Sequence, residues 1–168
     1  MRALILAAGH GVRLGMKKTP KCMAKVNKKP VLEHLVDKLN KAGIYEIVVN
    51  VHKDYDKIFK YFGTRLLYLY ESVLLGADGT EKVLKDWLGD EYIVMNGDTL
   101  TNINIKKLIK RGRESNLDIY FYKERFGGTK YVRRNAKNYD FWSGNGAFYF
   151  DIGSPKKLAR ARRFYGKL

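Results

Sequence analysis

Apolar residues follow two different spacings along this chain, and the two spacings alternate. Between residues 30 and 41 they recur every three or four positions, which predicts an amphipathic helix that Gly43 is placed to end. Short runs of consecutive apolar residues instead predict buried strands, at residues 1–6, 44–51, 66–70, 92–95, 117–122 and 147–150. The helical spacing predicts helices at residues 30–41, 54–61, 78–88, 104–113 and 155–165, the last with Ser154 as its N-cap.

The order of these elements indicates the fold class. Strands that alternate with helices of about ten residues favour an α/β fold, Rossmann-like, with a mostly parallel twisted sheet and helices on both faces. No internal repeat or low-complexity linker interrupts the chain, so one domain over residues 1–168 is expected. Residues 123–146 are rich in glycine, lysine, arginine and asparagine and are expected to be irregular. Sheets of this kind bind ligands at the carboxyl ends of their strands.

Composition narrows the class of protein. The apolar share of 45% fits a globular domain, and no apolar run approaches the roughly 20 residues that a membrane span needs. Residues 3–8 read as a buried strand rather than as part of a signal peptide. The single cysteine, Cys22, excludes an internal disulfide and fits a reducing compartment. A cytoplasmic protein is therefore expected.

The charge is strongly positive and uneven. The chain carries a formal net charge of +16, and residues 101–168 hold 17 basic and 5 acidic residues. Such a surface attracts nucleotides, acidic substrates, anionic membranes and nucleic acid. The positive charge could also reflect only a lysine-rich surface composition of the source organism, with no specific partner. Charge alone does not choose among these interpretations.

Three polar segments follow predicted strands, and the first is a glycine-containing loop. After the strand at residues 1–6 come two alanines, Gly9 and Gly11, which let a backbone approach a phosphate or a base without a clash. Arg13 and Lys21 add positive charge. No Gly-Lys-Ser/Thr phosphate motif is present, and Leu14 stands where the dinucleotide motif has glycine. Glycines after a strand, taken alone, are more often structural than functional.

The complete string carries more information than the glycines do. L-A-A-G-x-G-x-R at residues 6–13, followed by T-P-K and V-x-x-x-P, resembles the signature of sugar-phosphate nucleotidyltransferases. Further similar segments follow in order at residues 47–52, 71–76, 96–98 and 150–155. In style the chain resembles small N-acetylmuramate 1-phosphate uridylyltransferases and heptose 1-phosphate guanylyltransferases. The resemblance implies a nucleotidyltransferase fold and transfer of a nucleoside monophosphate from a nucleoside triphosphate to a sugar 1-phosphate, with release of pyrophosphate.

The resemblance also implies roles for particular residues. It makes Arg13, Lys21 and Asp98 the catalytic residues. It places the nucleotide against Leu6, Ala7, Ala8, Gly9, Gly11, Arg13, Lys21, Gly76 and Asp98. Backbone groups at Ala8, Gly9 and Gly76 would contact the base.

Two aspartates are candidates for a metal site. Asp98 and Asp151 both follow predicted strands in a strongly basic protein. Mg²⁺ accepts one or two carboxylates, while phosphate oxygens and water fill its other positions. A single aspartate after a strand is more often a cap or turn residue, but two beside a phosphate loop favour Mg²⁺. Asp151 could alternatively serve the entry into the last helix.

The acceptor region departs from the resemblance. The segments that hold the sugar in that family are not recognisable, so the acceptor-binding part, residues 115–150 approximately, is expected to be abbreviated. Its candidate phosphate contacts are Lys123, Lys130, Arg133 and Arg134. The acceptor could then be a small alkyl or choline-type phosphate instead of a sugar 1-phosphate. A second subunit could also complete the pocket, which makes a homo-oligomer possible.

Two other classes of function stay open at this point. A non-catalytic module could use the basic carboxy-terminal segment to bind nucleic acid or another polyanion. That alternative leaves Asp98 and Asp151 unexplained, because carboxylates repel phosphates unless a metal intervenes. A degenerate relative could bind nucleotide without turnover.

Overall fold

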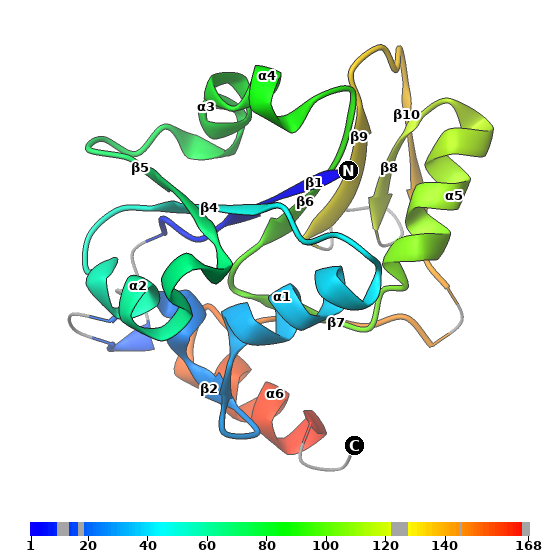
Figure 1. The fold of residues 1–168 in the computed structure, drawn as a ribbon. Helices are drawn as coiled ribbons and strands as arrows, with labels where there is room; N and C mark the ends of the chain where they lie inside the picture. Colours follow the sequence, from blue (N-terminus) through cyan, green and yellow to red (C-terminus); the bar gives the residue numbers. More distant parts are fainter. Residues whose placement is uncertain (10–13, 17–18, 122–127, 145, 166–168) are drawn as a thin grey trace.

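The computed structural model describes residues 1–9, 14–16, 19–121, 128–144 and 146–165. Figure 1 shows a central sheet with helices above and below it. The strands are β1 (Arg2–Leu6), β2 (Lys25–Val26), β3 (Lys29–Pro30), β4 (Ile47–Val51), β5 (Leu67–Tyr70), β6 (Glu91–Asn96), β7 (Thr99–Thr101), β8 (Asp118–Phe121), β9 (Thr129–Arg133), β10 (Tyr139–Trp142) and β11 (Tyr149–Asp151). The helices are α1 (Val31–Lys41), α2 (Asp56–Phe62), α3 (Gly76–Val83), α4 (Lys85–Leu88), α5 (Ile105–Ser115) and α6 (Pro155–Tyr165), with short 3₁₀ turns at η2 (Lys21–Met23) and η3 (Gly63–Arg65).

Seven strands form the central sheet in the order β10-β8-β9-β6-β1-β4-β5. The half that contains β6, β1, β4 and β5 is parallel throughout. On the other side, β9 runs antiparallel to both β6 and β8, and β10 is parallel to β8. The sheet is therefore mixed, and its parallel half holds the strands that the sequence predicts best.

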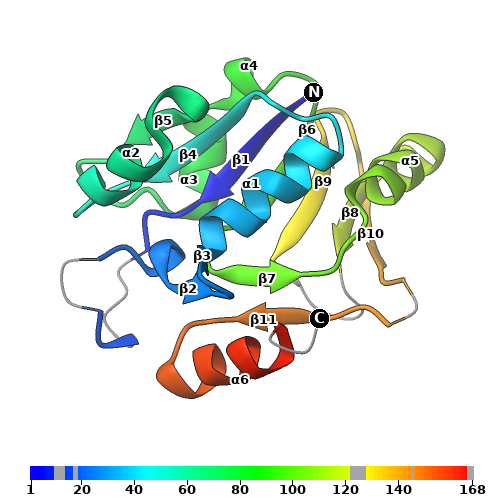
Figure 2. The same cartoon turned by 60° about the horizontal axis from the view of Figure 1, so that its bottom comes forward.

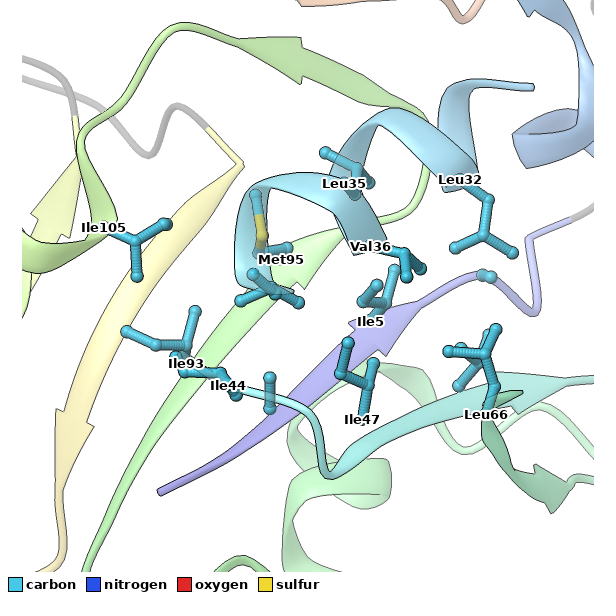
Figure 3. Close-up of a cluster of buried hydrophobic side chains, with 14 of the residues drawn as sticks. Ile5, Leu32, Leu35, Val36, Ile44, Ile47, Leu66, Ile93, Met95 and Ile105 are labelled. Atoms are coloured by element: carbon cyan, nitrogen blue, oxygen red, sulfur yellow. The ribbon is translucent and has the colours of Figure 1, made fainter. Parts of the chain in front are cut away.

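Helices cover both faces of the sheet, as the sequence predicts. On one face α1, α2 and α5 pack on the strands through a large apolar cluster, part of which Figure 3 shows. Leu32, Leu35 and Val36 of α1 lie over Ile5 and Ile47 in this view. On the opposite face α4 packs on the sheet through a smaller cluster around Leu88 and Val94. β1 is buried from both sides, which explains its continuous apolar sequence.

Particular residues determine where α5 begins and ends and how closely it packs on the sheet. The side chain of Asn104 caps the helix by accepting a hydrogen bond from the Lys107 amide at 3.0 Å. Asn116 ends it in the left-handed conformation, with φ of 58°. Gly112 faces β9, where a Cβ atom would overlap the ring of Tyr131. A glycine here lets the helix approach the fully buried tyrosine.

A small second layer lies at one edge of the sheet. β7 and β11 pair as an antiparallel ribbon, and α6 lies beside it (Figure 2). Leu100, Ile152, Leu158 and Ala161 bury their side chains here against residues of β2 and α1. Ser154 accepts hydrogen bonds at the start of α6 from the amides of the third and fourth residues after it. The ribbon thus carries residues from the end of the chain to the edge where β1 and β6 end.

The sequence predicts eleven segments, and each contains a helix or a strand of the predicted type. Two expectations are corrected. Residues 78–88 form two helices, α3 and α4, not one. Residues 123–146 include β9 and β10 instead of being irregular throughout. The strand predicted at residues 147–150 is present as β11, and it pairs antiparallel with Thr99–Thr101 of β7 outside the main sheet.

Candidate active site

Three chain segments meet where β1 and β6 end. Leu6 lies beside Asn96 in the parallel register, so the two strands finish together. Gly97 donates a backbone hydrogen bond to the Leu6 carbonyl at 2.8 Å. A Cβ atom on Gly97 would lie 2.9 Å from that carbonyl and 3.0 Å from the Cβ of Ala7. Only glycine permits this contact, which holds the turn before Asp98 against the start of the first loop.

The side chain of Lys21 lies between the two candidate metal ligands. Its ammonium donates to Oδ2 of Asp98 and lies 3.5 Å from Oδ1 of Asp151. Lys21 is mostly buried, and the two carboxylates are partly exposed, at 30% and 37% of their side-chain surface. The structure therefore brings together three sequence-predicted site residues from positions 21, 98 and 151.

Backbone pairing of the ribbon aligns the two aspartates. Asp151 lies opposite Thr99 in the β7–β11 register, and the Ile152 amide donates to the Asp98 carbonyl at 3.0 Å. Gly153 follows closely, and a Cβ atom there would lie 2.7 Å from Asp151 Oδ1 and 3.1 Å from Lys21 Nζ. Residues 151–153 thus form part of the site as well as the entry into α6.

Asp151 has a carboxylate that its surroundings keep ionised. Burial raises the pKa of this group, but three neighbours outweigh that effect: Lys157, the Gly153 amide and Lys21. The pKa of Asp151 consequently lies below its ordinary value. Lys157 Nζ is 2.6 Å from Oδ2, and the Gly153 amide is 2.5 Å from Oδ1. Sequence reasoning missed Lys157, although its position six residues after Asp151 on a predicted helix was a usable signal.

Residues expected to contact the nucleotide lie at the same edge. Leu6 ends β1, and Ala7 to Gly9 follow it. Gly76 begins α3 with φ of 72°, a conformation that favours glycine. Gly11 and Arg13 lie outside the described residues, so the structure gives no position for either.

Other candidates lie elsewhere. Arg134 pairs with Asp86 and Asp90, and Arg133 lies beside Glu91 in the register, so both are at the opposite edge of the sheet. Lys130 pairs with Glu81 at 2.7 Å. These positions contradict the interpretation of Arg133 and Arg134 as acceptor contacts, because β9 runs antiparallel to β6 and carries them away from Asp98. Lys123 lies outside the described residues.

Cys22 follows Lys21 in the sequence, but its thiol is buried and unreactive. Burial raises the pKa of its thiol to about 12, so the thiol stays protonated at neutral pH. Its side chain belongs to the main apolar cluster.

The comparisons with known proteins place this edge in context. Residues 3–132 match the MobA-like NTP transferase domain family. The chain belongs to that family. The matched residues include Lys21, Asp98 and, except for Arg2, the four strands of the parallel half of the sheet.

Two relatives of this MobA-like domain carry the names of enzymes that act on sugar phosphates. A D-glycero-alpha-D-manno-heptose 1-phosphate guanylyltransferase from Campylobacter jejuni is 38% identical over 115 residues, covering 64% of this chain and 52% of the relative. A UTP–glucose-1-phosphate uridylyltransferase from Haloferax volcanii is 30% identical over 131 residues, covering 74% of this chain and 54% of the relative. The chain therefore spans about half the length of these curated relatives.

Solved structures confirm the fold. A UDP-glucose pyrophosphorylase from Acinetobacter baumanii superimposes on this MobA-like domain with a TM-score of 0.84 and 15% identity. The alignment covers 98% of this chain and 93% of the other. The expected Rossmann-like nucleotidyltransferase fold is therefore correct.

The donor set in this MobA-like domain is suited to Mg²⁺. Two carboxylate groups converge on one cation, the Lys21 ammonium, and carboxylate oxygens are ligands that Mg²⁺ prefers. Within the described ranges, no cluster of three or more His, Cys, Asp or Glu side chains forms a cage. Two carboxylates alone leave coordination positions for phosphate oxygens and water, which fits a metal shared with a substrate.

Two surface hollows have similar volumes, and one of them lies next to the site. One, of about 440 Å³, is lined by Ala147, Phe148, Tyr149, Phe150, Asp151, Lys157 and Arg160, next to the carboxylates. Another, of about 450 Å³, lies between α1, β7 and the start of α5, away from them. Only the first of these two hollows is lined by one of the two carboxylates, that of Asp151.

Proposed function

We propose that this chain transfers a nucleoside monophosphate from a nucleoside triphosphate to a phosphorylated acceptor. The observation that carries the proposal is the convergence of Asp98 and Asp151 on the Lys21 ammonium, beside the loop that follows β1. Membership of the MobA-like family and the names of the relatives support the same reaction class.

The proposed reaction requires no covalent bond between the protein and its substrates. An acceptor phosphate oxygen attacks the α-phosphorus of the triphosphate, the bond to the oxygen that bridges the α- and β-phosphorus breaks, and pyrophosphate leaves with that electron pair. The attacking oxygen is already anionic, so no general base is required. The protein's task is to hold two anions together and to stabilise the charge of the transition state.

Particular residues suit these tasks. Lys21 holds an ammonium group at the convergence point, where it would offset charge on the α-phosphate region. Asp98 and Asp151 would hold Mg²⁺, which when bound supplies positive charge to the reacting phosphates. Lys157 keeps the Asp151 carboxylate ionised and in place. Arg13 is proposed to bind the triphosphate.

We infer that the acceptor enters by the hollow at the free side of β11. Lys157 and Arg160 supply positive charge there, and Phe148 and Tyr149 supply apolar surface. A sugar 1-phosphate is the acceptor that the relatives' names favour. A small alkyl or choline-type phosphate is the second candidate, because few residues line the hollow, all of them from the β11 segment and α6.

The test is pyrophosphate release with Mg²⁺ for each common nucleoside triphosphate against a panel of sugar 1-phosphates and small alkyl phosphates. Activity that requires one triphosphate and one acceptor, and that disappears without Mg²⁺, would support the proposal and name both substrates. Nucleotide binding with no turnover on any acceptor would instead favour a degenerate relative or a missing subunit. Failure to bind any nucleotide would overturn the proposal and leave polyanion binding as the better hypothesis.

The remaining expectations stay predictions. A homo-oligomer that completes the acceptor pocket can be tested by light scattering. Along the residues that the structure describes, no helix is both long and apolar enough to cross a membrane. The cytoplasmic location is a proposal that rests on the single cysteine of the sequence. Nucleic acid is not the proposed partner, since binding a polyanion would leave the convergence of Asp98 and Asp151 on Lys21 unexplained.

A further inference from the structure

A buried polar network links the two segments that are proposed to hold the nucleoside. It consists of Asn50, Glu71 and Thr80, whose exposed fractions are 4%, 3% and 0%. Asn50 lies near the end of β4, between β1 and β5 in the register. Glu71 follows β5 directly and Thr80 belongs to α3. Neither the catalytic proposal nor the sequence signature assigns these side chains a role.

Asn50 holds the start of the first loop. Its Oδ1 accepts hydrogen bonds from the Ala7 amide at 2.6 Å and from the Ala8 amide at 3.3 Å. Its Nδ2 donates to Glu71 Oε1 at 2.9 Å and lies 3.2 Å from Thr80 Oγ1. Position 50 therefore needs an acceptor on one side and a donor on the other, which an amide provides in a single planar group.

Glu71 holds the second segment. Its Oε2 accepts from the Leu75 amide at 3.2 Å, directly before Gly76. Its Oε1 faces the donors of Asn50 and Thr80. A carboxylate is the side chain that only accepts, so it matches three converging donors. Among the described residues no lysine or arginine forms an ion pair with it, so hydrogen bonds alone offset its burial.

We propose that Asn50 and Glu71 are positioning residues that set the separation between the Ala7–Ala8 backbone and the Leu75–Gly76 backbone, and so shape the pocket for the nucleoside of the triphosphate. This inference rests on the proposed function. The network contacts neither the carboxylates nor Lys21, so it acts on nucleotide affinity and not on the chemical step.

The hydrogen-bond directions suggest a charge-conserving exchange. In Asn50→Asp the donor to Glu71 is lost and two carboxylates face each other. In Glu71→Gln the introduced NH₂ group faces either the Asn50 Nδ2 donor or the Leu75 N–H donor, so that two donors oppose each other in either orientation. In the double variant the introduced glutamine donates to the introduced aspartate and accepts from Leu75, while that aspartate still accepts from Ala7 and Ala8. Both side chains then have matching partners again.

The experiment measures dissociation constants by calorimetry with Mg²⁺, for the preferred nucleoside triphosphate and for inorganic tripolyphosphate, and KM and kcat alongside. Each single variant is expected to weaken nucleotide binding about tenfold, the scale of one broken buried hydrogen-bond contact. Tripolyphosphate binding and kcat at saturating nucleotide should stay within about threefold. The double variant should return nucleotide binding to within about threefold of wild type. Asp118→Asn is the matched control, a carboxylate-to-amide change at a residue that accepts a hydrogen bond from the Arg133 amide at 2.8 Å, at the opposite edge of the sheet.

The outcomes separate the two proposals. A wild-type chain that binds no nucleotide overturns the proposed function, and this inference with it. A wild-type chain that binds and turns over, with single variants that bind equally well, overturns only the inference. Equal weakening for nucleotide and tripolyphosphate also overturns it, since general loosening of the fold affects both. If a single variant does not fold, Thr80→Val carries the same test, with about threefold weaker nucleotide binding expected and unchanged binding overturning the inference.

Discussion

Two polar clusters lie at the same edge of the sheet, and they are built on opposite principles. In the Asn50–Glu71–Thr80 network every side chain is buried and the donors and acceptors match one another. In the cluster of Lys21, Asp98 and Asp151 the side chains are charged, and the carboxylates are partly open to solvent. This difference in burial and charge separates the two roles. A closed, matched network fixes geometry, whereas convergent charge with solvent access is suited to binding an ion or a substrate.

The largest expected effect lies in the charged cluster. Asp98→Asn should lower kcat for pyrophosphate release by at least about 10³-fold, since it removes a full negative charge from the proposed metal site. Folding should persist, because the turn before Asp98 is held by backbone contacts of Gly97. Pyrophosphate release and circular dichroism check both points. Activity near wild type would show that Asp98 is only a turn residue and that the charged cluster does not bind the metal.

Lys21→Ala should give the next largest effect. Removing one fixed positive charge at the reacting phosphates is expected to lower kcat by about 10² to 10³. Nucleotide affinity should change less than kcat, in contrast to variants of the matched network. Steady-state kinetics with both substrates varied separates the two parameters. A kcat within threefold of wild type would remove Lys21 from the proposed chemistry.

Sequence reasoning found the charged cluster because its residues lie in recognisable strings. Asp98 and Lys21 each stand in a short motif, and strand order predicts that loops after parallel strands meet. The matched network was missed because its meaning depends on burial and on which atom faces which. Asn50 and Glu71 are ordinary polar residues in the sequence, 21 positions apart. Only the register of β1, β4 and β5 brings them together.

The strands also differ in how well the sequence predicts them. Strands of the parallel half are continuous apolar runs, which local spacing predicts. β9 and β10 lie in a segment rich in lysine, arginine and tyrosine, where long polar side chains obscure the alternation. β11 was found as a strand, but its partner depends on a contact between residues about 50 positions apart. Pairing over such distances cannot be read from local spacing.

Substitutions at two glycines should differ in their effect on stability and on activity. Gly97→Ala would place a Cβ atom against the Leu6 carbonyl and the Ala7 side chain, which cannot move aside, so about 1–3 kcal/mol of stability should be lost. In Gly153→Ala the nearest atoms are side-chain ends of Asp151 and Lys21. That variant should retain its stability and lose about tenfold in activity, because the reacting groups shift. Urea unfolding and pyrophosphate release distinguish the two. Equal loss of stability in both would contradict this division.

The smallest effect is expected at an exposed ion pair far from either cluster. Arg113 donates to Glu91, and this hydrogen bond holds the pKa of Glu91 below its ordinary value. A carboxyl group whose pKa is lowered by folding adds stability above its ordinary pKa and loses that contribution as the pH falls through the folded value. Arg113→Met should therefore destabilise the protein by less than about 1 kcal/mol at neutral pH, and by progressively less in acid. Urea unfolding of both proteins from about pH 7 to about pH 3 measures the difference. A difference that stays constant from neutral to acid pH would show that Arg113 stabilises the fold by packing and not through the charge of Glu91.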